Sequence, residues 1–132
     1  MTVQPEVGSI RPRALVVEDE VATRTLLAHA LDGMGFDATQ TQDRARALEL
    51  AASDQPDIIV LDLNLGQGPT GIDLIDPLLE AAPYCGILIL TTFRSPQLAG
   101  ATSPLPAAVS FLCKRDLTSV EVLITAVEAA ME

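Results

Sequence analysis

The sequence has few aromatic side chains and few basic ones. Phe, Tyr and Trp make up 3% of the 132 residues, so aliphatic side chains must fill the core, as they do in parallel sheets covered by helices. Eight Lys and Arg residues stand against eighteen Asp and Glu residues, which gives a formal net charge of −10. A chain this acidic repels phosphate backbones, which argues against direct binding to nucleic acid or to anionic membranes.

Features of exported and membrane-inserted proteins are also lacking. No apolar run approaches the ~20 residues that span a bilayer, and residues 1–12 contain no stretch of signal-peptide type. We therefore expect a cytoplasmic protein. Cys85 and Cys113 lack metal-site spacing, and we expect them about 10 Å or more apart at opposite ends of neighbouring strands, which predicts two free thiols. The single histidine, His29, is interpreted as a residue on a helix surface, not as a ligand or a phosphodonor.

The chain does contain strand patterns that alternate with helix patterns over the length of one domain. Residues 1–12 have no clear period and are interpreted as a flexible leader, which leaves 13–132 as the domain. Five short apolar runs predict strands at 14–17, 36–41, 58–62, 86–90 and 109–113. Short connections and right-handed crossovers favour an α/β fold with a doubly wound parallel sheet. In such sheets the functional site lies beyond the carboxyl ends of the strands.

Apolar residues at helical spacing predict helices between these strands and after the last one. The first helix should end near Gly33, Asp43 should cap the second, and Pro77 should kink or weaken the third. The pattern Thr118–Glu121 resembles a capping box for the last helix. Residues 94–106, which include three prolines, predict a helix that is short, displaced or partly disordered. The positions expected to face inward are Leu27, Ala30, Leu31, Met34, Ala47, Leu48, Ala51, Ile72, Ile75, Leu79, Val120, Leu123, Ile124, Val127 and Met131.

Polar side chains stand at the ends of four predicted strands. Glu18 and Asp19 follow the first strand, Asp62 ends the third, Thr91 follows the fourth and Lys114 follows the fifth. Because the carboxyl ends of parallel strands meet at one edge of a sheet, we expect these side chains to lie close together. A single acid at a strand end is commonly only a solvated cap, whereas polar groups at four strand ends together indicate a site.

The expected site has an excess of negative charge. Three carboxylates in one crevice repel each other, and Lys114 supplies only one positive charge. A hard divalent cation would supply the rest, and an all-oxygen site with few protein ligands suits Mg²⁺. Such an ion also neutralises charge on the oxygens of a phosphoryl group during its transfer. Asp62, at the centre of the edge, is then placed as a nucleophile, and the chemistry indicated is formation of an acyl phosphate.

Four segments carry these strand-end residues. They are Ala-Leu-Val-Val-Glu-Asp-Glu (14–20), Ile-Val-Leu-Asp-Leu-Asn-Leu (59–65), Ile-Leu-Thr-Thr-Phe (89–93) and Phe-Leu-Cys-Lys (111–114). In this order and spacing they resemble the motifs of the response-regulator receiver family of two-component signalling, over roughly residues 13–131. The resemblance implies a flavodoxin/CheY-like (βα)5 fold with strand order 2-1-3-4-5 and five helices.

The resemblance also implies a phosphoacceptor and a metal site. Asp62 matches the phosphoacceptor, and Asp19 matches the acid that binds Mg²⁺ directly. Glu18 matches the neighbouring acid, which usually acts through a metal-bound water, and Asn64 would offer its backbone carbonyl to the metal.

A switch and its partners are implied in the same way. Thr91 and Lys114 would contact the phosphoryl group, and Phe111 matches the aromatic residue whose rotation accompanies the movement of Thr91. Phe111 has no hydroxyl, so its signal must be transmitted by packing. The implied phosphodonor is a sensor histidine kinase or a phosphotransfer protein, and the implied target is an output partner or an appended output domain. We expect no turnover of external substrates.

The chain departs from the usual family pattern at several positions, and two alternative functions stay open. Glu18 stands where Asp is common, and Gly66 stands where Pro is common. A pseudo-receiver, which binds partners without being phosphorylated, would lack the acceptor, the metal-binding acid or the lysine, and this chain has all three. A phosphatase of the haloacid dehalogenase type needs a second acid two residues after its nucleophile, where this chain has Asn64.

Overall fold

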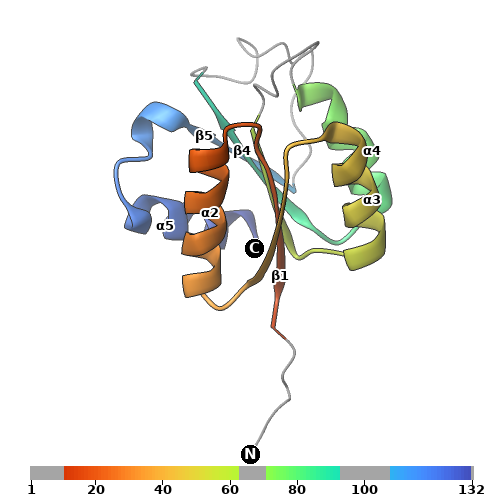
Figure 1. The fold of residues 1–132 in the computed structure, drawn as a ribbon, viewed down its shortest axis with the longest axis horizontal. Coiled ribbons are helices and arrows are strands. Elements are labelled where there is room, and N and C mark those ends of the chain that lie inside the picture. Colours follow the sequence, from red (N-terminus) through yellow and green to blue (C-terminus); the bar gives the residue numbers. More distant parts are fainter. Residues whose placement is uncertain (1–10, 63–70, 93–107, 132) are drawn as a thin grey trace, which may run out of the picture.

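Five parallel strands form one sheet in the order β2-β1-β3-β4-β5 (Figure 1). The structure, a computed structural model, describes residues 11–62, 71–92 and 108–131. The strands are β1 (Arg13–Val17), β2 (Asp37–Thr41), β3 (Ile58–Asp62), β4 (Gly86–Thr91) and β5 (Val109–Cys113). The predicted doubly wound α/β fold and its strand order are confirmed.

Helices cover both faces of this sheet. In the described part of the chain they are α2 (Val21–Gly33), α3 (Arg44–Asp54), α4 (Ile75–Ala81) and α5 (Val120–Ala130), with short 3-10 turns η1 (Gly71–Leu74) and η2 (Lys114–Asp116). Figure 1 shows α2 and α5 on one side of the sheet and α3 and α4 on the other. Residues 1–10 of the predicted leader (1–12), the predicted metal ligand Asn64 and the segment 94–106 lie outside the described residues.

The hydrophobic core consists of two clusters, one on each face of the sheet. All five residues of β3 are buried, and its four apolar residues alternate between the two clusters. Ile59 and Leu61 pack with the side chains of α3 and α4, whereas Ile58 and Val60 pack with those of α2 and α5. This alternation fixes the direction of each side chain in β3, and it leaves Asp62 as the last residue of the central strand.

The end of α2 and the start of α3 form as predicted, and the end of α3 has an unexpected hydrogen-bonded link to α4. The α2 helix ends at Gly33, and the Asp43 carboxylate caps α3 by accepting a hydrogen bond from the Arg46 backbone N–H. Gln55 follows α3 with φ 48°, in the left-handed region. Its side-chain amide donates to the carbonyl oxygens of two α3 residues and, at 2.7 Å, to that of Ala81, so Gln55 joins the ends of α3 and α4.

The predicted start of α5 is wrong by one residue, and two of its predicted core positions are wrong. Ser119, not Thr118, caps the helix by accepting a hydrogen bond from the backbone N–H of Val122. Val120 is 52% exposed and Met131 is 41% exposed. Val120 begins the helix and Met131 follows its last residue, so both lie beyond the part of α5 that covers the sheet. The buried residues are Leu123, Val127 and Ala130.

Regular α-helix begins only at Ile75, directly after the 3-10 turn η1, which agrees with the weakened turn expected near Pro77. Pro77 therefore lies in the first turn of α4, where a backbone N–H has no partner within the helix and its loss costs little. The inward face also differs slightly from the prediction. Leu78 is buried in place of Leu79, which is half-buried. In α3, Leu50 is buried and the predicted Leu48 is half-buried. Three other predicted core residues are also only half-buried: Ala30 of α2, Met34 just after α2, and Ile124 of α5.

The α5 helix approaches the sheet very closely at its carboxyl end. Gly86 begins β4, and a Cβ atom at this position would overlap the backbone carbonyl of Ala130. Only glycine allows the helix to reach the strand at this distance.

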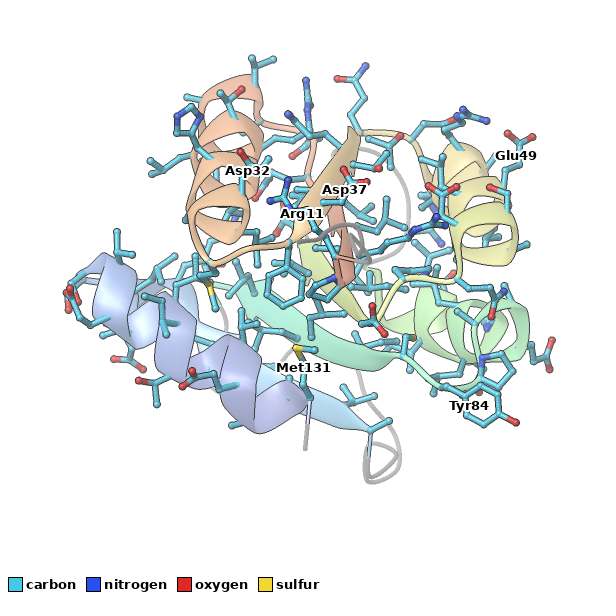
Figure 2. All side chains as sticks on the ribbon, turned by 90° about the horizontal axis from the view of Figure 1, so that it is seen from below. Arg11, Asp32, Asp37, Glu49, Tyr84 and Met131 are labelled. Atoms are coloured by element: carbon cyan, nitrogen blue, oxygen red, sulfur yellow. The ribbon has the colours of Figure 1, made fainter. Side chains whose placement is uncertain are left out.

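Arg11 attaches the start of the described chain to the turn between α2 and β2. Its guanidinium donates to the backbone oxygens of Gly35 and Phe36, at 3.1 and 2.6 Å, and pairs with the Asp32 carboxylate at 3.2 Å. Figure 2 shows Arg11 beside Asp32 and Asp37, seen from below the sheet. The entry of the chain into β1 is therefore fixed by polar contacts.

Both cysteines are buried and free, which confirms that they do not form a disulfide. Cys113 pairs in register with Thr91 at the carboxyl end of β4, while Cys85 precedes the first residue of that strand. None of the helices in the described residues has both the length and the apolar character needed to cross a membrane.

Candidate functional site

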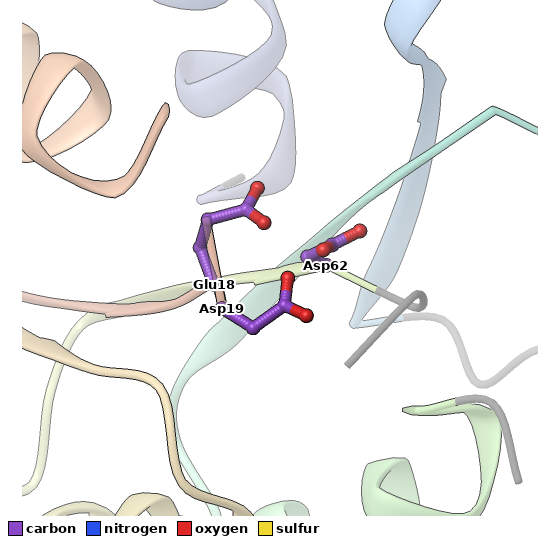
Figure 3. A group of neighbouring side chains, drawn as sticks. All are labelled: Glu18, Asp19 and Asp62. Atoms are coloured by element: carbon purple, nitrogen blue, oxygen red, sulfur yellow. The ribbon is translucent and has the colours of Figure 1, made fainter. Parts of the chain in front are cut away.

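Three carboxylates meet at the carboxyl edge of the sheet. Glu18 and Asp19 follow β1, and Asp62 ends the neighbouring strand β3, which pairs with β1 up to Val17 and Leu61. One carboxylate oxygen from each acid lies within 4.8 Å of the others (Figure 3). Glu18 and Asp62 are only 1% and 2% exposed, whereas Asp19 faces solvent. The structure therefore brings together the acids that the sequence places at separate strand ends.

Lys114 lies between two of these carboxylates. It follows β5, and its Nζ is 3.3 Å from Oε1 of Glu18 and 3.2 Å from Oδ1 of Asp62. Desolvation lowers the pKa of Lys114, but the charges of Asp62 and Glu18 and hydrogen bonds to them outweigh it, so the net pKa is raised. Lys114 is thus a cation shared by two buried acids.

The one lysine does not balance the charge of the cluster, and Glu18 shows the effect. Burial, a hydrogen bond with Asp62 and repulsion by the Asp62 charge raise the pKa of Glu18 from its ordinary 4.5 to about 7. Attraction to Lys114 and a hydrogen bond from the Glu20 backbone N–H, 3.3 Å from Oε2, act in the opposite direction. Glu18 is therefore partly protonated near neutral pH, and a bound cation would displace that proton.

The donor set fits a hard divalent cation. Three carboxylates within reach of one another supply oxygen ligands, which Mg²⁺ prefers. A divalent cation would also offset the like charges that Lys114 leaves uncompensated. Glu18, Asp19 and Asp62 would hold the ion in this site.

The predicted switch residues lie on the two strands beside this cluster. Thr91 ends β4 and is fully buried, and it pairs in register with Cys113. Phe111 pairs with Ile89, is half-buried, and packs on the cluster beneath α3 and α4. Because Thr91 is two residues along β4 from Ile89, it lies on the same face of the sheet as Phe111.

The structure adds Arg24, a residue that the sequence analysis does not identify. Arg24 lies in the first turn of α2, and its Nη1 donates to the backbone oxygen of Glu18 at 3.0 Å and to the side-chain oxygen of Gln42 at 3.4 Å. A positive charge is unfavourable at the amino end of a helix unless it has a partner. That misplaced charge, just after an acidic run, is the signal in the sequence that could have drawn attention to Arg24.

Comparison with known proteins identifies the family. A family model of the response regulator receiver domain matches residues 14–128. The chain belongs to the receiver domain family. This receiver domain is 37% identical to response regulator MprA from Mycolicibacterium vanbaalenii over 79 residues, which cover 60% of this chain and 34% of MprA. The chain spans about a third of the length of the curated relatives MprA and PhoP from Bacillus subtilis.

Solved structures have the same fold as this receiver domain. A response regulator receiver protein from Sinorhizobium medicae is 23% identical with a TM-score of 0.75, covering 92% of this chain and 94% of that chain. A response regulator from Burkholderia pseudomallei is 28% identical with a TM-score of 0.70, covering 88% of this chain and 66% of that one. The Burkholderia protein was solved with a phosphorylated aspartic acid, a calcium ion and citrate.

Proposed function

We propose that this receiver domain accepts a phosphoryl group on Asp62 in the presence of Mg²⁺ and transmits a signal through the resulting change in conformation. The observation that carries the proposal is the position of Asp62, a buried carboxylate at the end of the central strand with a lysine and two further acids around it. The phosphorylated aspartic acid of the Burkholderia relative supports it. The chain would act in the cytoplasm, and the donor would be a sensor histidine kinase or a phosphotransfer protein.

The transfer is a displacement at phosphorus. A carboxylate oxygen of Asp62 forms the new bond to phosphorus, while the bond from phosphorus to the donor's imidazole nitrogen breaks. The electron pair of that bond leaves with the imidazole, and an acyl phosphate stays on Asp62. Mg²⁺, when bound, would neutralise charge on the phosphoryl oxygens. Glu18 and Asp19 would hold it, and Lys114 places a fixed positive charge beside Asp62.

The conformational signal would begin at Lys114 and Thr91. Lys114 now contacts two carboxylates, and a phosphoryl group on Asp62 would offer it oxygens of higher charge. The Thr91 hydroxyl would donate to the same group, and Phe111, which packs on the same face, would follow its movement. We infer that the chain is an acceptor and not an enzyme with external turnover. Its output would lie in a partner or in an attached domain, as in the longer relatives.

Phosphorylation with a small phosphodonor tests the proposal. Incubation with acetyl phosphate and Mg²⁺ should add the mass of one phosphoryl group, and EDTA should prevent it. Asp62→Asn should abolish the addition, because an amide oxygen is a poor nucleophile. Asp76→Asn, which changes an exposed acid on α4, is the matched control and should be labelled normally. Equal labelling of Asp62→Asn and the wild type would show that another residue accepts the group.

Titration of Mg²⁺ by calorimetry tests whether Asp19 binds the metal while Lys114 responds to the phosphoryl group. Asp19→Ala should abolish Mg²⁺ binding or weaken it greatly, because it removes the solvent-facing ligand. Lys114→Ala should still accept the phosphoryl group but should show a smaller conformational response. Unchanged Mg²⁺ affinity in Asp19→Ala would contradict the metal site.

A further inference from the structure

The backbone of Glu18 is held on both sides by residues outside its own strand. Its N–H donates to the backbone oxygen of Thr41 at 3.0 Å, and its carbonyl oxygen accepts from Nη1 of Arg24 at 3.0 Å. The same guanidinium reaches Gln42, which follows β2. Arg24 therefore connects the first turn of α2 to the loops after β1 and β2.

The carbonyl that Arg24 holds belongs to the peptide unit between Glu18 and Asp19. A peptide unit is planar, so a donor that fixes its oxygen restricts the backbone torsions on both sides, ψ of Glu18 and φ of Asp19. These two torsions direct the two side chains. Glu18 points into the protein toward Lys114 and Asp62, while Asp19 keeps a carboxylate oxygen within 4.8 Å of both other acids. The orientation of one peptide thus determines whether the carboxylates converge.

We propose that Arg24 is a positioning residue of the metal site, which holds the Glu18–Asp19 peptide in the orientation that lets Glu18, Asp19 and Asp62 bind one cation. The proposal rests on the proposed function, and it adds a residue that would contact neither the metal nor the phosphoryl group. Residues that orient metal ligands commonly change metal affinity about 10- to 100-fold when they are replaced.

The sign of the change separates positioning from simple electrostatics. Arg24 is positively charged, and its removal would by Coulomb attraction alone strengthen the binding of a cation nearby. Loss of positioning acts in the opposite direction, because the two carboxylates no longer converge. A variant without the guanidinium therefore binds Mg²⁺ more weakly if Arg24 positions the acids, and equally or more tightly if it contributes only charge.

The experiment measures Mg²⁺ affinity by calorimetry on the unphosphorylated chain, with circular dichroism as a check of folding. Arg24→Met should weaken Mg²⁺ binding about 10- to 100-fold. Arg24→Lys keeps the charge and one donor but loses the planar fork, and should weaken it about three- to tenfold. Arg46→Met, which removes an exposed arginine of α3 paired with Glu49, is the matched control and should stay within about twofold of the wild type. Labelling of Arg24→Met at saturating Mg²⁺ should recover, because Asp62 and Lys114 are intact.

Each result supports or overturns the proposal. Wild-type or tighter Mg²⁺ affinity in folded Arg24→Met overturns it. If Arg24→Met fails to fold, Arg24→Lys decides, and an affinity equal to that of the wild type overturns the proposal. A wild-type chain that binds Mg²⁺ but is never labelled on Asp62 would refute the proposed function alone. A labelled wild type together with unaltered affinity in the Arg24 variants would refute the positioning role alone.

Discussion

Replacement of Glu18 by Gln should change how the stability of this receiver domain depends on pH. The pKa of Glu18 is about 7 in the folded chain and is taken as its ordinary 4.5 in the unfolded chain. The folded state therefore binds the proton more tightly. The stability that this proton contributes is fully present below pH 4.5 and is lost as the pH rises through 7. Gln cannot ionise, so Glu18→Gln should lack this loss.

The size of the effect follows from the same two pKa values. One pKa unit corresponds to about 1.36 kcal/mol, so ionisation of Glu18 should cost the folded wild type about 3 kcal/mol between pH 4.5 and 8. All other titrating groups are common to both chains. The free energy of unfolding of Glu18→Gln, relative to that of the wild type, should therefore rise by about 2.5 kcal/mol as the pH is raised from 5 to 8.

Urea unfolding in EDTA at several pH values measures this difference. Glu49→Gln, which changes an exposed acid of α3, is the control, and its curve should run parallel to that of the wild type. Asp62→Asn removes a hydrogen bond and a charge that both raise the pKa of Glu18, so it should reduce the pH dependence. If Glu18→Gln and the wild type stay parallel from pH 5 to 8, Glu18 does not hold the proton and the electrostatic account of the site is incorrect.

Three further predictions concern the metal, the close approach of α5 and the thiols. Mg²⁺ affinity should fall as the pH is lowered from 8 to 6, because a cation must displace the proton of Glu18; a calorimetric affinity independent of pH would contradict this. Gly86→Ala should lower the free energy of unfolding by about 1–3 kcal/mol in urea, because the added methyl group overlaps the carbonyl of Ala130; unchanged stability would mean that α5 lies further from β4. A thiol count under denaturing, non-reducing conditions should find two free thiols, Cys85 and Cys113, and a count of zero would overturn their placement.

The parts of the fold that sequence predicts best are those whose residues are buried on both sides. Ile58 to Leu61 form a continuous apolar run that ends in an acid, which is typical of a central parallel strand, and the structure confirms β3. The meeting of Glu18, Asp62 and Lys114 was predictable for a related reason. Parallel strands end at a common edge, so residues far apart in sequence become neighbours once the topology is known.

The sequence could not predict two kinds of feature: the exact ends of helices, and side-chain contacts between different elements. Val120 and Met131 have the spacing of core residues, but Val120 is the first residue of α5 and Met131 follows its last, and periodicity does not reveal where along a helix burial begins and ends. Ser119 and Thr118 are both good caps, and the choice between them depends on the path of the chain after η2. Arg24 has no recognisable motif, because its role arises only when α2 lies beside the ends of β1 and β2.

The bridge formed by Gln55 gives the α3–α4 layer a common pivot. Its amide joins the carboxyl ends of α3 and α4, which lie at the edge of the sheet away from the three acids. The opposite ends of the two helices have a separate link, the ion pair between Arg44 of α3 and Asp73 of η1 at 2.7 Å. A displacement that starts near Asp62 would therefore turn the two helices together about their joined ends, instead of sliding one past the other. The ends of α3 and α4 nearest the site would then move furthest, and they would move as one unit.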